Sequence, residues 1–290
     1  MQHNVALRSL CENATVPTAR SPSCNQWRQE DLERWHKFHA LLVEEASSYA
    51  PPKGRDGGSL LLVGDSITEA FRGTALGNRV KRTAGKDKSL LPLSTDYPSP
   101  LILAISGDET QHVLWRLLSG ELSANVSNAS ELWISLLIGT NNLGNAHHSP
   151  EDTAAGVLAV ARMLLQQTRG RLLVHALLPR DVKRTVQTPH VSLMPQVHRT
   201  NALVAASVDT DLALRFPGRV RTADCGGLFR PHEHGSRAGP HPPPVEVNQT
   251  LMPDGVHPSI EGSRMLAECV RRALRRWRSD VDAVGRDLRR

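Results

Sequence analysis

Short apolar runs alternate with helix-like segments along most of this 290-residue chain. The runs predict strands, because each is short and most are almost continuously apolar. They are residues 60–63, 101–105, 132–138, 172–178 and 219–222. Apolar positions recur at helical spacing in the segments between and after them, which are 109–118, 150–167, 196–208 and 259–277. Strands that alternate with helices in this way predict an α/β fold, in which helices cover both faces of a parallel sheet.

The two ends of the chain depart from this alternation. Residues 1–26 predict a loose N-terminal arm, because they contain few apolar anchors. Residues 27–50 predict an amphipathic helix that packs on the domain, since Trp and Leu positions recur at helical spacing. Residues 281–290 predict a basic C-terminal tail. The span 27–280 is then expected to form a single domain.

Two internal segments also interrupt the pattern. Residues 73–100 are charged and rich in turn formers, and residues 230–250 are rich in Pro and His. Both predict surface insertions into one domain. The second segment contains His232, His234 and His241. No matched carboxylate or cysteine pattern accompanies these histidines, so the sequence favours a solvated loop over a metal site.

The net charge of +6 comes largely from arginines near the C-terminus. A basic patch can meet nucleic acid, anionic lipid or acidic glycan. The sequence lacks a nucleic-acid-binding signature, so we expect a solvated arginine-rich helix face and no nucleic-acid partner. No apolar run approaches the roughly 20 residues that span a bilayer, so no transmembrane segment is expected.

The cysteines and glycosylation sequons leave the compartment open. Cys11, Cys24, Cys225 and Cys269 show no CxxC or zinc spacing, so no metal is expected. The first residues lack the features of a signal peptide, which favours the cytoplasm. A disulfide between Cys11 and Cys24 would favour the secretory route instead. Four N-x-S/T sequons favour the same alternative, at Asn13, Asn125, Asn128 and Asn248.

Polar clusters follow three of the predicted strands and precede the last helix. They are GDS at 64–66, SGD at 106–108, GTNN at 139–142 and DGVH at 254–257. The carboxyl ends of parallel strands meet at one edge of a sheet, where such folds bind their ligands. We therefore expect the four clusters to form one site.

The residue types in these clusters are those of a serine hydrolase. Ser66 would act as nucleophile, and His257 has the ordinary pKa range of the base that a serine needs. Asp254 is close enough in sequence to orient the imidazole of His257. The oxyanion formed by attack would be stabilised by the N–H groups of Ser66 and Gly107 and by the amide of Asn141.

Each cluster also has a purely structural interpretation. Ser66 can be a helix cap, since Asp and Ser are favoured at helix starts. Asn141 and Asn142 can simply close the turn after a strand. Asp65 and Asp108 are expected to cap helices or support the site rather than to react. Two aromatic rings early in the next helix can edge the pocket or pack in the core: His112 and Trp115.

The four blocks, in this order, resemble those of the SGNH (GDSL-type) hydrolases. The resemblance spans roughly residues 60–274, and it places the family's catalytic and oxyanion residues on the positions named above. Within that span, SGDETQHVLWRLLSGEL at 106–122 and ALLPR at 176–180 resemble the catalytic subunits of platelet-activating-factor acetylhydrolases. The resemblance implies a flavodoxin-like three-layer α/β/α sandwich with a central five-stranded parallel sheet. It also implies cleavage of short acyl esters, acetyl above all, without metal or cofactor.

The sequence therefore predicts a serine esterase that acts on short-chain or O-acetyl esters. A small molecule, a glycan or a lipid could carry the ester, so a glycan or cell-wall acetylesterase, a lysophospholipase and a thioesterase are alternatives. A binding module that keeps the fold without turnover is an alternative of another class. The oligomeric state stays open, and a homodimer is compatible with the sequence.

Overall fold

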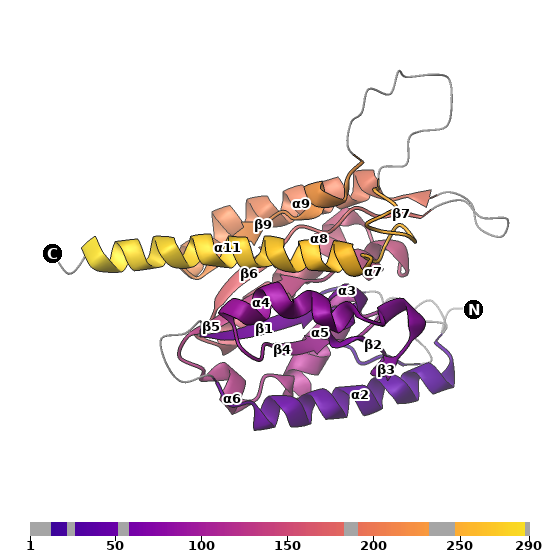
Figure 1. The fold of residues 1–290 in the computed structure, drawn as a ribbon, viewed down its shortest axis with the longest axis horizontal. Coiled ribbons are helices and arrows are strands. Elements are labelled where there is room, and N and C mark those ends of the chain that lie inside the picture. The colour runs from indigo at the N-terminus through magenta and orange to yellow at the C-terminus, as the bar shows by residue number, and fades with distance from the viewer. Residues whose placement is uncertain (1–12, 22–26, 52–57, 183–190, 232–246, 288–290) are drawn as a thin grey trace, which may run out of the picture.

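A five-stranded parallel sheet forms the centre of the molecule (Figure 1). The computed structural model describes residues 13–21, 27–51, 58–182, 191–231 and 247–287. The strands are β1 (Ser59–Gly64), β4 (Leu101–Ala104), β5 (Leu132–Leu137), β6 (Arg171–His175) and β9 (Val220–Ala223). All four neighbouring pairs run parallel, so the predicted α/β fold and its parallel sheet are confirmed.

The order of the strands, β4-β1-β5-β6-β9, places a reversal of the chain's path next to β1. From β1 the chain crosses to β4 on one side and then returns to build the rest of the sheet on the other side. This is the flavodoxin-like order, in which ligands bind beyond the carboxyl ends of the strands at the switch point. The residues that follow β1, β4 and β5 thus share one end of the sheet.

Four helices cover one face of the sheet. They are α2 (Gln29–Ser48), α5 (Thr110–Arg116), α8 (Pro150–Gln167) and α9 (Met194–Ser207). Their buried side chains and the alternate residues of the strands form one apolar cluster, which includes Trp35, Val113, Val157 and Val204. The periodicity that predicted these helices therefore marks the faces that they bury.

Helices α4 (Leu91–Asp96) and α11 (Ile260–Asp287) cover the opposite face, and they cross the front of the molecule in Figure 1. Leu93 of α4 and Leu274 of α11 belong to the same buried cluster as Ile102 of β4. The Trp277 and Trp133 rings meet edge to face, with their centroids 5.3 Å apart. Together with the first face, these helices complete the three layers.

Shorter elements connect the layers. The short helices are α3 (Ser66–Glu69), α6 (Ala124–Ser127), α7 (Thr140–Gly144) and α10 (Ala213–Arg215). Two small hairpins are formed by β2 (Thr74–Ala75) with β3 (Asn78–Arg79) and by β7 (Asp181–Val182) with β8 (Val191–Ser192). None of the helices in the part of the chain that the structure describes is both long enough and apolar enough to cross a membrane.

The segment 73–100 is more than the surface insertion that its charge predicted. It contains α4, whose Leu93 is fully buried, and Tyr97 directly after that helix is 1% exposed. These two side chains pack into the sheet, so the segment supplies part of one covering layer. Of the segment 230–250, residues 232–246 and their histidines lie outside the described residues, while Val247 is buried.

Both predicted chain ends differ from the structure. Helix α11 continues to Asp287, past residue 281, where the sequence predicted a tail to begin. The described part of the N-terminal arm, 13–21, is not loose. Its backbone hydrogen bonds to α5 through Thr18 N–H and Gln111 O, 3.1 Å apart, and Arg20 is 2% exposed. A buried charge that binds another segment leaves no signal in local apolar periodicity, so the sequence pattern could not indicate this contact.

A disulfide links Cys225 to Cys269, with Cα atoms 6.1 Å apart. It joins the chain after β9 to α11, and the sequence did not predict it because the two residues are 44 positions apart. Cys11 and Cys24 lie outside the described residues, so their pairing stays a prediction, as does the compartment.

Replacing Leu93 tests whether α4 contributes to the hydrophobic core and so to the stability of the fold. We expect Leu93→Ala to lower the free energy of unfolding by about 2–5 kcal/mol, because it leaves a cavity in the core. The matched control is Leu91→Ala in the same helix, since Leu91 is 70% exposed. Its effect should stay within about 0.5 kcal/mol. Urea unfolding of both variants gives the comparison, and equal losses would contradict the assignment of α4 to the core.

Candidate active site

Ser66, His257 and Asp254 form one chain of hydrogen bonds. Ser66 begins α3 directly after β1, and Asp65 caps that helix by accepting a hydrogen bond from Ile67 N–H at 3.0 Å. Ser66 Oγ lies 3.0 Å from His257 Nε2. His257 Nδ1 lies 2.7 Å from Asp254 Oδ2. The structure thus brings together three residues that the sequence predicted to meet, from positions up to 191 apart.

The turn that carries Asp254 determines which imidazole nitrogen holds the proton. Asp254 Oδ1 accepts hydrogen bonds from the backbone N–H groups of Val256 and His257. Partial burial alone would raise the pKa of Asp254, but these bonds and the one from the His257 ring hold it well below its usual range. An ionised carboxylate can only accept, so Nδ1 of His257 must donate. The neutral ring then presents an unprotonated Nε2 to the serine, as a general base requires.

The predicted oxyanion donors lie on neighbouring turns. The N–H of Ser66 is at the start of α3, where the first helical N–H groups have no acceptor within the helix. Asn141 Nδ2 donates to Asp108 O at 2.9 Å, and its Oδ1 accepts from Asn145 at 3.2 Å. These two bonds orient the amide and leave its second N–H without a partner among the described residues. The bond to Asp108 also ties α7 to the Gly107 turn.

Two glycines permit close approaches at this edge. A Cβ on Gly64 would lie 2.3 Å from Thr68 Oγ1, so only glycine lets β1 turn so tightly into α3. Gly107 has a φ of +82°. A Cβ there would also lie 2.7 Å from the Trp27 ring. The backbone at Gly107 therefore takes a conformation that other residues rarely adopt.

A buried carboxylate, that of Asp108, holds the turn after β4. It accepts hydrogen bonds from Arg20 Nη2 at 2.8 Å, Trp35 Nε1 at 2.8 Å and Arg116 Nε at 2.7 Å. Arg20 Nη2 also donates to Ser106 O at 2.6 Å. Burial alone would raise the pKa of Asp108, but the guanidinium groups of Arg116 and Arg20 hold it below its usual value. Asp108 is therefore a structural anion, in agreement with the supporting role predicted for it.

Glu69 fixes the same turn from the other side. Its Oε2 accepts from both the N–H and the Oγ of Ser106, each at 2.6 Å. Its carboxylate also accepts from the N–H groups of Leu76 and Gly77. Glu69 is fully buried and lies three positions after the proposed nucleophile. One carboxylate thus couples α3 to the residue before Gly107.

The GTNN turn is held by two partners. Asn142 Oδ1 accepts from Thr110 N–H at 3.0 Å, which joins α7 to the start of α5. Arg180 Nη1 donates to Thr140 O at 2.9 Å. Asn142 therefore joins α7 to α5, while Asn141 bonds to the turn that contains Gly107.

His112 and Trp115 do not edge the site. His112 is 1% exposed, and its Nδ1 accepts a hydrogen bond from Glu109 N–H at 3.1 Å. Burial lowers the pKa of His112 to about 3, so the ring is neutral and acts as part of a helix cap. The Trp115 ring packs 5.5 Å from that of Trp35. The core-packing alternative is therefore correct for both residues.

Sequence reasoning missed the residues that hold the site in place. Arg116 and Glu69 left a weak signal, since each is a charge inside an otherwise apolar segment. Arg180 left a signal only as the last residue of the ALLPR stretch, which did not indicate its partner. Arg20 left none, because it is an arginine in a chain rich in arginine and its partner is remote in sequence.

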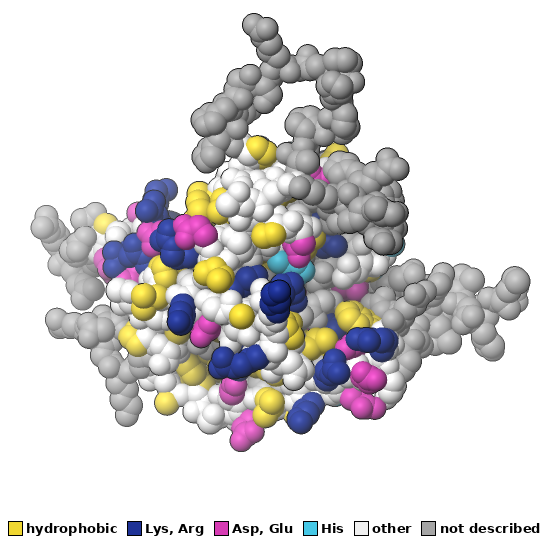
Figure 2. Space-filling view, turned by 45° about the vertical axis from the view of Figure 1, so that its right-hand side comes forward, with side chains coloured by type: hydrophobic (Ala, Val, Ile, Leu, Met, Phe, Trp, Pro, Cys, Tyr) yellow, Lys and Arg dark blue, Asp and Glu magenta, His cyan; other side chains and the backbone are white. Residues whose placement is uncertain are grey.

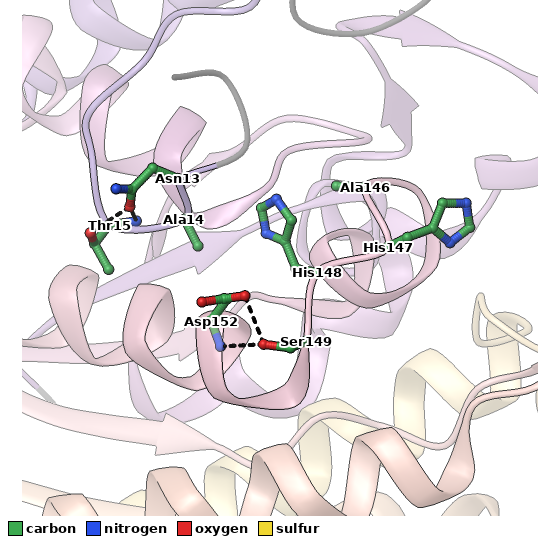
Figure 3. Close-up of a pocket in the computed structure, with 8 residues that line it drawn as sticks. All are labelled: Asn13, Ala14, Thr15, Ala146, His147, His148, Ser149 and Asp152. Carbon is green, nitrogen blue, oxygen red and sulfur yellow. Dashed lines mark hydrogen bonds between the residues drawn. The ribbon is translucent and has the colours of Figure 1, made fainter. Parts of the chain in front are cut away.

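A hollow of about 490 Å³ lies apart from the triad, between the N-terminal segment and the loop after α7 (Figure 3). Its lining includes Asn13, His147 and His148, but none of the triad. Ser149, which caps α8, bonds to Asp152 on one side of this hollow. No group of His, Cys, Asp and Glu residues arranged to hold a metal occurs among residues that the structure describes.

Comparison with curated proteins identifies relatives. The chain is 30% identical over 152 residues to the platelet-activating factor acetylhydrolase IB subunit alpha2 of Gallus gallus, which covers 52% of this chain and 54% of the relative. It is 28% identical over 176 residues to the platelet-activating factor acetylhydrolase IB subunit alpha1 of Homo sapiens, and this match covers 60% of this chain and 62% of the relative. The matches thus span between half and two thirds of the length of these relatives. No family model matches the chain.

The chain thus resembles the acetylhydrolase subunits in sequence, in agreement with the predicted likeness to the SGNH hydrolases. A GDSL-like lipase from Bacteroides thetaiotaomicron has the same fold, with a TM-score of 0.57 at 16% identity. The superposition covers 82% of this chain and 97% of the lipase. At that identity the likeness concerns the fold, and the predicted flavodoxin-like sandwich is confirmed.

The cap residue Asp65 makes a testable contribution to stability. Asp65 is 1% exposed, and its Oδ2 has no hydrogen-bond partner in the described part of the chain. Burial raises the pKa of Asp65 to about 7. Between about pH 4 and 7 the folded protein holds a proton that the unfolded chain has released, so this group lowers stability as pH rises.

We expect Asp65→Asn to remove the decrease in stability that Asp65 causes as pH rises. The unfolding free energy of the variant minus that of the wild type should rise from about pH 4 to 7, by at most about 1.4 kcal/mol per pH unit, and then level off. Urea unfolding across this range measures the difference. A difference that is constant with pH would show that Asp65 does not titrate in this window.

Removal of Arg20 tests the buried ion cluster. We expect Arg20→Met to lower the free energy of unfolding by about 3–5 kcal/mol, because Asp108 keeps its charge and loses a counter-ion. Arg34→Met is the control, since Arg34 forms only exposed pairs with Glu30 and Asp31 and should change stability by about 1 kcal/mol or less. Thermal and urea unfolding give both values. Similar losses in the two variants would mean that the buried pair contributes no more than a surface pair.

Proposed function

We propose that this protein is a serine esterase that hydrolyses carboxylic esters through an acyl-enzyme. The single observation that carries the proposal is the hydrogen-bonded chain from Ser66 Oγ to His257 and on to Asp254. It stands at the carboxyl edge of the sheet, where this strand order places ligands. The names of the curated relatives, which are acetylhydrolase subunits, support the same class of reaction.

In the first half of the proposed reaction, Ser66 Oγ attacks the ester carbonyl carbon as its proton passes to His257 Nε2. The carbonyl π electrons move to oxygen, and the resulting anion is stabilised by the N–H groups of Ser66 and Gly107 and by the Asn141 amide. When the anion collapses, the bond to the alcohol oxygen breaks. His257 gives its proton to that oxygen, and an acyl-Ser66 remains.

The second half of the reaction uses the same groups with water. A water molecule attacks the acyl carbon while His257 Nε2 takes its proton. Collapse of this second anion releases the carboxylic acid and returns the proton to Ser66 Oγ. Asp254 keeps its charge throughout and stabilises the imidazolium formed in each half.

We infer that the acyl group is short, with acetyl the first candidate. The likeness of residues 106–122 and 176–180 to the acetylhydrolase subunits supports this class. Glycan acetyl esters, lysophospholipids and thioesters remain the other substrates to be assayed.

Ester hydrolysis by matched variants tests the mechanism. On p-nitrophenyl esters from acetyl to octanoyl, wild type should prefer short chains, and Ser66→Ala should lose on the order of 10⁶ in kcat. Asp254→Asn should lose about 10⁴, because an amide can donate to Nδ1 and favour the wrong tautomer. Ser130→Ala, at an exposed serine, is the control that keeps activity.

Labelling separates an esterase from a binding module on the same fold. A fluorophosphonate should modify wild type at Ser66 and leave Ser66→Ala unmodified, because it reacts only with an activated serine. Folded wild-type protein that neither labels nor cleaves any ester would overturn the esterase proposal in favour of binding without turnover.

A further inference from the structure

A hollow of about 580 Å³ adjoins His257, the proposed general base. Lys81, Arg82, Lys86, Asp254 and His257 line it, together with the first residues of α11, and we call it the basic pocket. In Figure 2, dark-blue Lys and Arg side chains and a cyan histidine lie together near the middle of this face. The pocket is therefore continuous with the triad.

The position of the basic pocket identifies which part of an ester would occupy it. The carbonyl oxygen must point toward Gly107 and Asn141, and neither residue lines this pocket. His257 must reach the alcohol oxygen in order to protonate it as it leaves. The alcohol part therefore lies on the histidine side of the reacting carbon, which is the side that the basic pocket occupies.

The negative charges in the basic pocket are already engaged. Asp254 is bound to the His257 ring and to two backbone N–H groups. Glu261 binds Arg264 through both carboxylate oxygens, at 2.9 and 2.5 Å. The positive charges are not engaged. None of Lys81, Arg82 and Lys86 forms a side-chain hydrogen bond or ion pair with any residue that the structure describes.

Lys86 is the unusual member of this group, because it is only 4% exposed. Its segment is held against the start of α11 by the bond from Ser89 Oγ to Ile260 O at 2.9 Å. Burial, followed by the charge of Arg82, lowers the pKa of Lys86, and the carboxylate of Asp254 offsets this only in part, without a hydrogen bond to Lys86. A buried ammonium without a counter-ion is costly, so such groups are normally paired. An anion in the basic pocket would supply the missing partner.

We propose that the basic pocket binds a negatively charged group, a carboxylate, phosphate or sulfate, on the alcohol part of the ester substrate. This inference rests on the proposed esterase function and adds a substrate class to it. Lys81 and Arg82 attract the group at the rim, and Lys86 binds it inside. The preferred substrate is then an acetyl ester of an acidic alcohol.

A matched pair of esters tests the proposal: 3-acetoxybenzoate and its neutral methyl ester. Both lose the same acyl group, and each kcat/KM is divided by the rate constant for hydroxide so that leaving-group chemistry cancels. We expect wild type to favour the anion by about tenfold or more. Added salt should reduce that preference, since the rim charges are exposed. The corresponding acetoxyphenyl phosphate and sulfate show which anion fits best.

Variants assign the preference to the basic pocket. In the double variant Lys81→Ala with Arg82→Ala, the ratio of anionic to neutral kcat/KM should fall by about tenfold. Lys88→Ala, at an exposed lysine of the short helix Lys86–Leu90 that lies outside the lining, should leave the ratio unchanged. An equal preference for both esters in wild type, or an equal fall with Lys88→Ala, would overturn the proposal and leave the esterase mechanism intact.

Binding without turnover separates this proposal from the esterase proposal. Calorimetric titration of wild type with 3-hydroxybenzoate should show binding that its methyl ester lacks and that Lys86→Met abolishes. Lys86→Met should also melt at a higher temperature without ligand, because it removes an unpaired buried charge. Such binding in a protein that cleaves no ester would support anion binding by the basic pocket and overturn the esterase proposal. If wild type does not bind 3-hydroxybenzoate and Lys86→Met melts at the same temperature as wild type, the proposed anion binding is overturned.

Discussion

The buried carboxylate of Asp108 is the constraint on which the site depends. It has no exposed surface, and leaving such a charge unpaired would cost several kcal/mol. Folding must therefore bring Arg20, Trp35 and Arg116 to it, from the N-terminal segment, α2 and α5. The same three donors fix the turn that contains Gly107, the glycine proposed as an oxyanion donor. The N-terminal segment is thus a structural part of the catalytic edge, although it contributes no reacting group.

Two aspartates next to the reacting groups have pKa values displaced in opposite directions. Asp254 accepts bonds from its own turn and from His257, which keep it ionised. Asp65 is buried directly before Ser66, and one of its oxygens has no described partner, so burial raises its pKa to about 7. The environment decides which carboxyl group can hold an imidazolium and which serves only to cap a helix. The proposed division of roles follows from solvation and hydrogen bonding.

The surroundings of the triad differ between the side of Ser66 and the side of His257. On one side of Ser66, neutral N–H groups are positioned for an oxyanion. On the other side, His257 adjoins a pocket whose cations have no described partners. In the proposed reaction, a single histidine therefore separates the place of the carbonyl oxygen from that of the leaving alcohol. A basic pocket in the second place affects which alcohol is bound without altering the acyl chemistry.

The sequence by itself determined the strands, the main helices and the four polar clusters, because each is a local pattern with a fixed period or a short turn. Parallel pairing then forces the ends of β1, β4 and β5 together, so Ser66, Gly107 and Asn141 could be predicted. Tertiary structure alone decided that α4 covers the sheet, that Arg20 binds Asp108 and that Cys225 meets Cys269. These contacts join positions far apart in the chain. Their free energy comes from burial and charge compensation, which no local periodicity records.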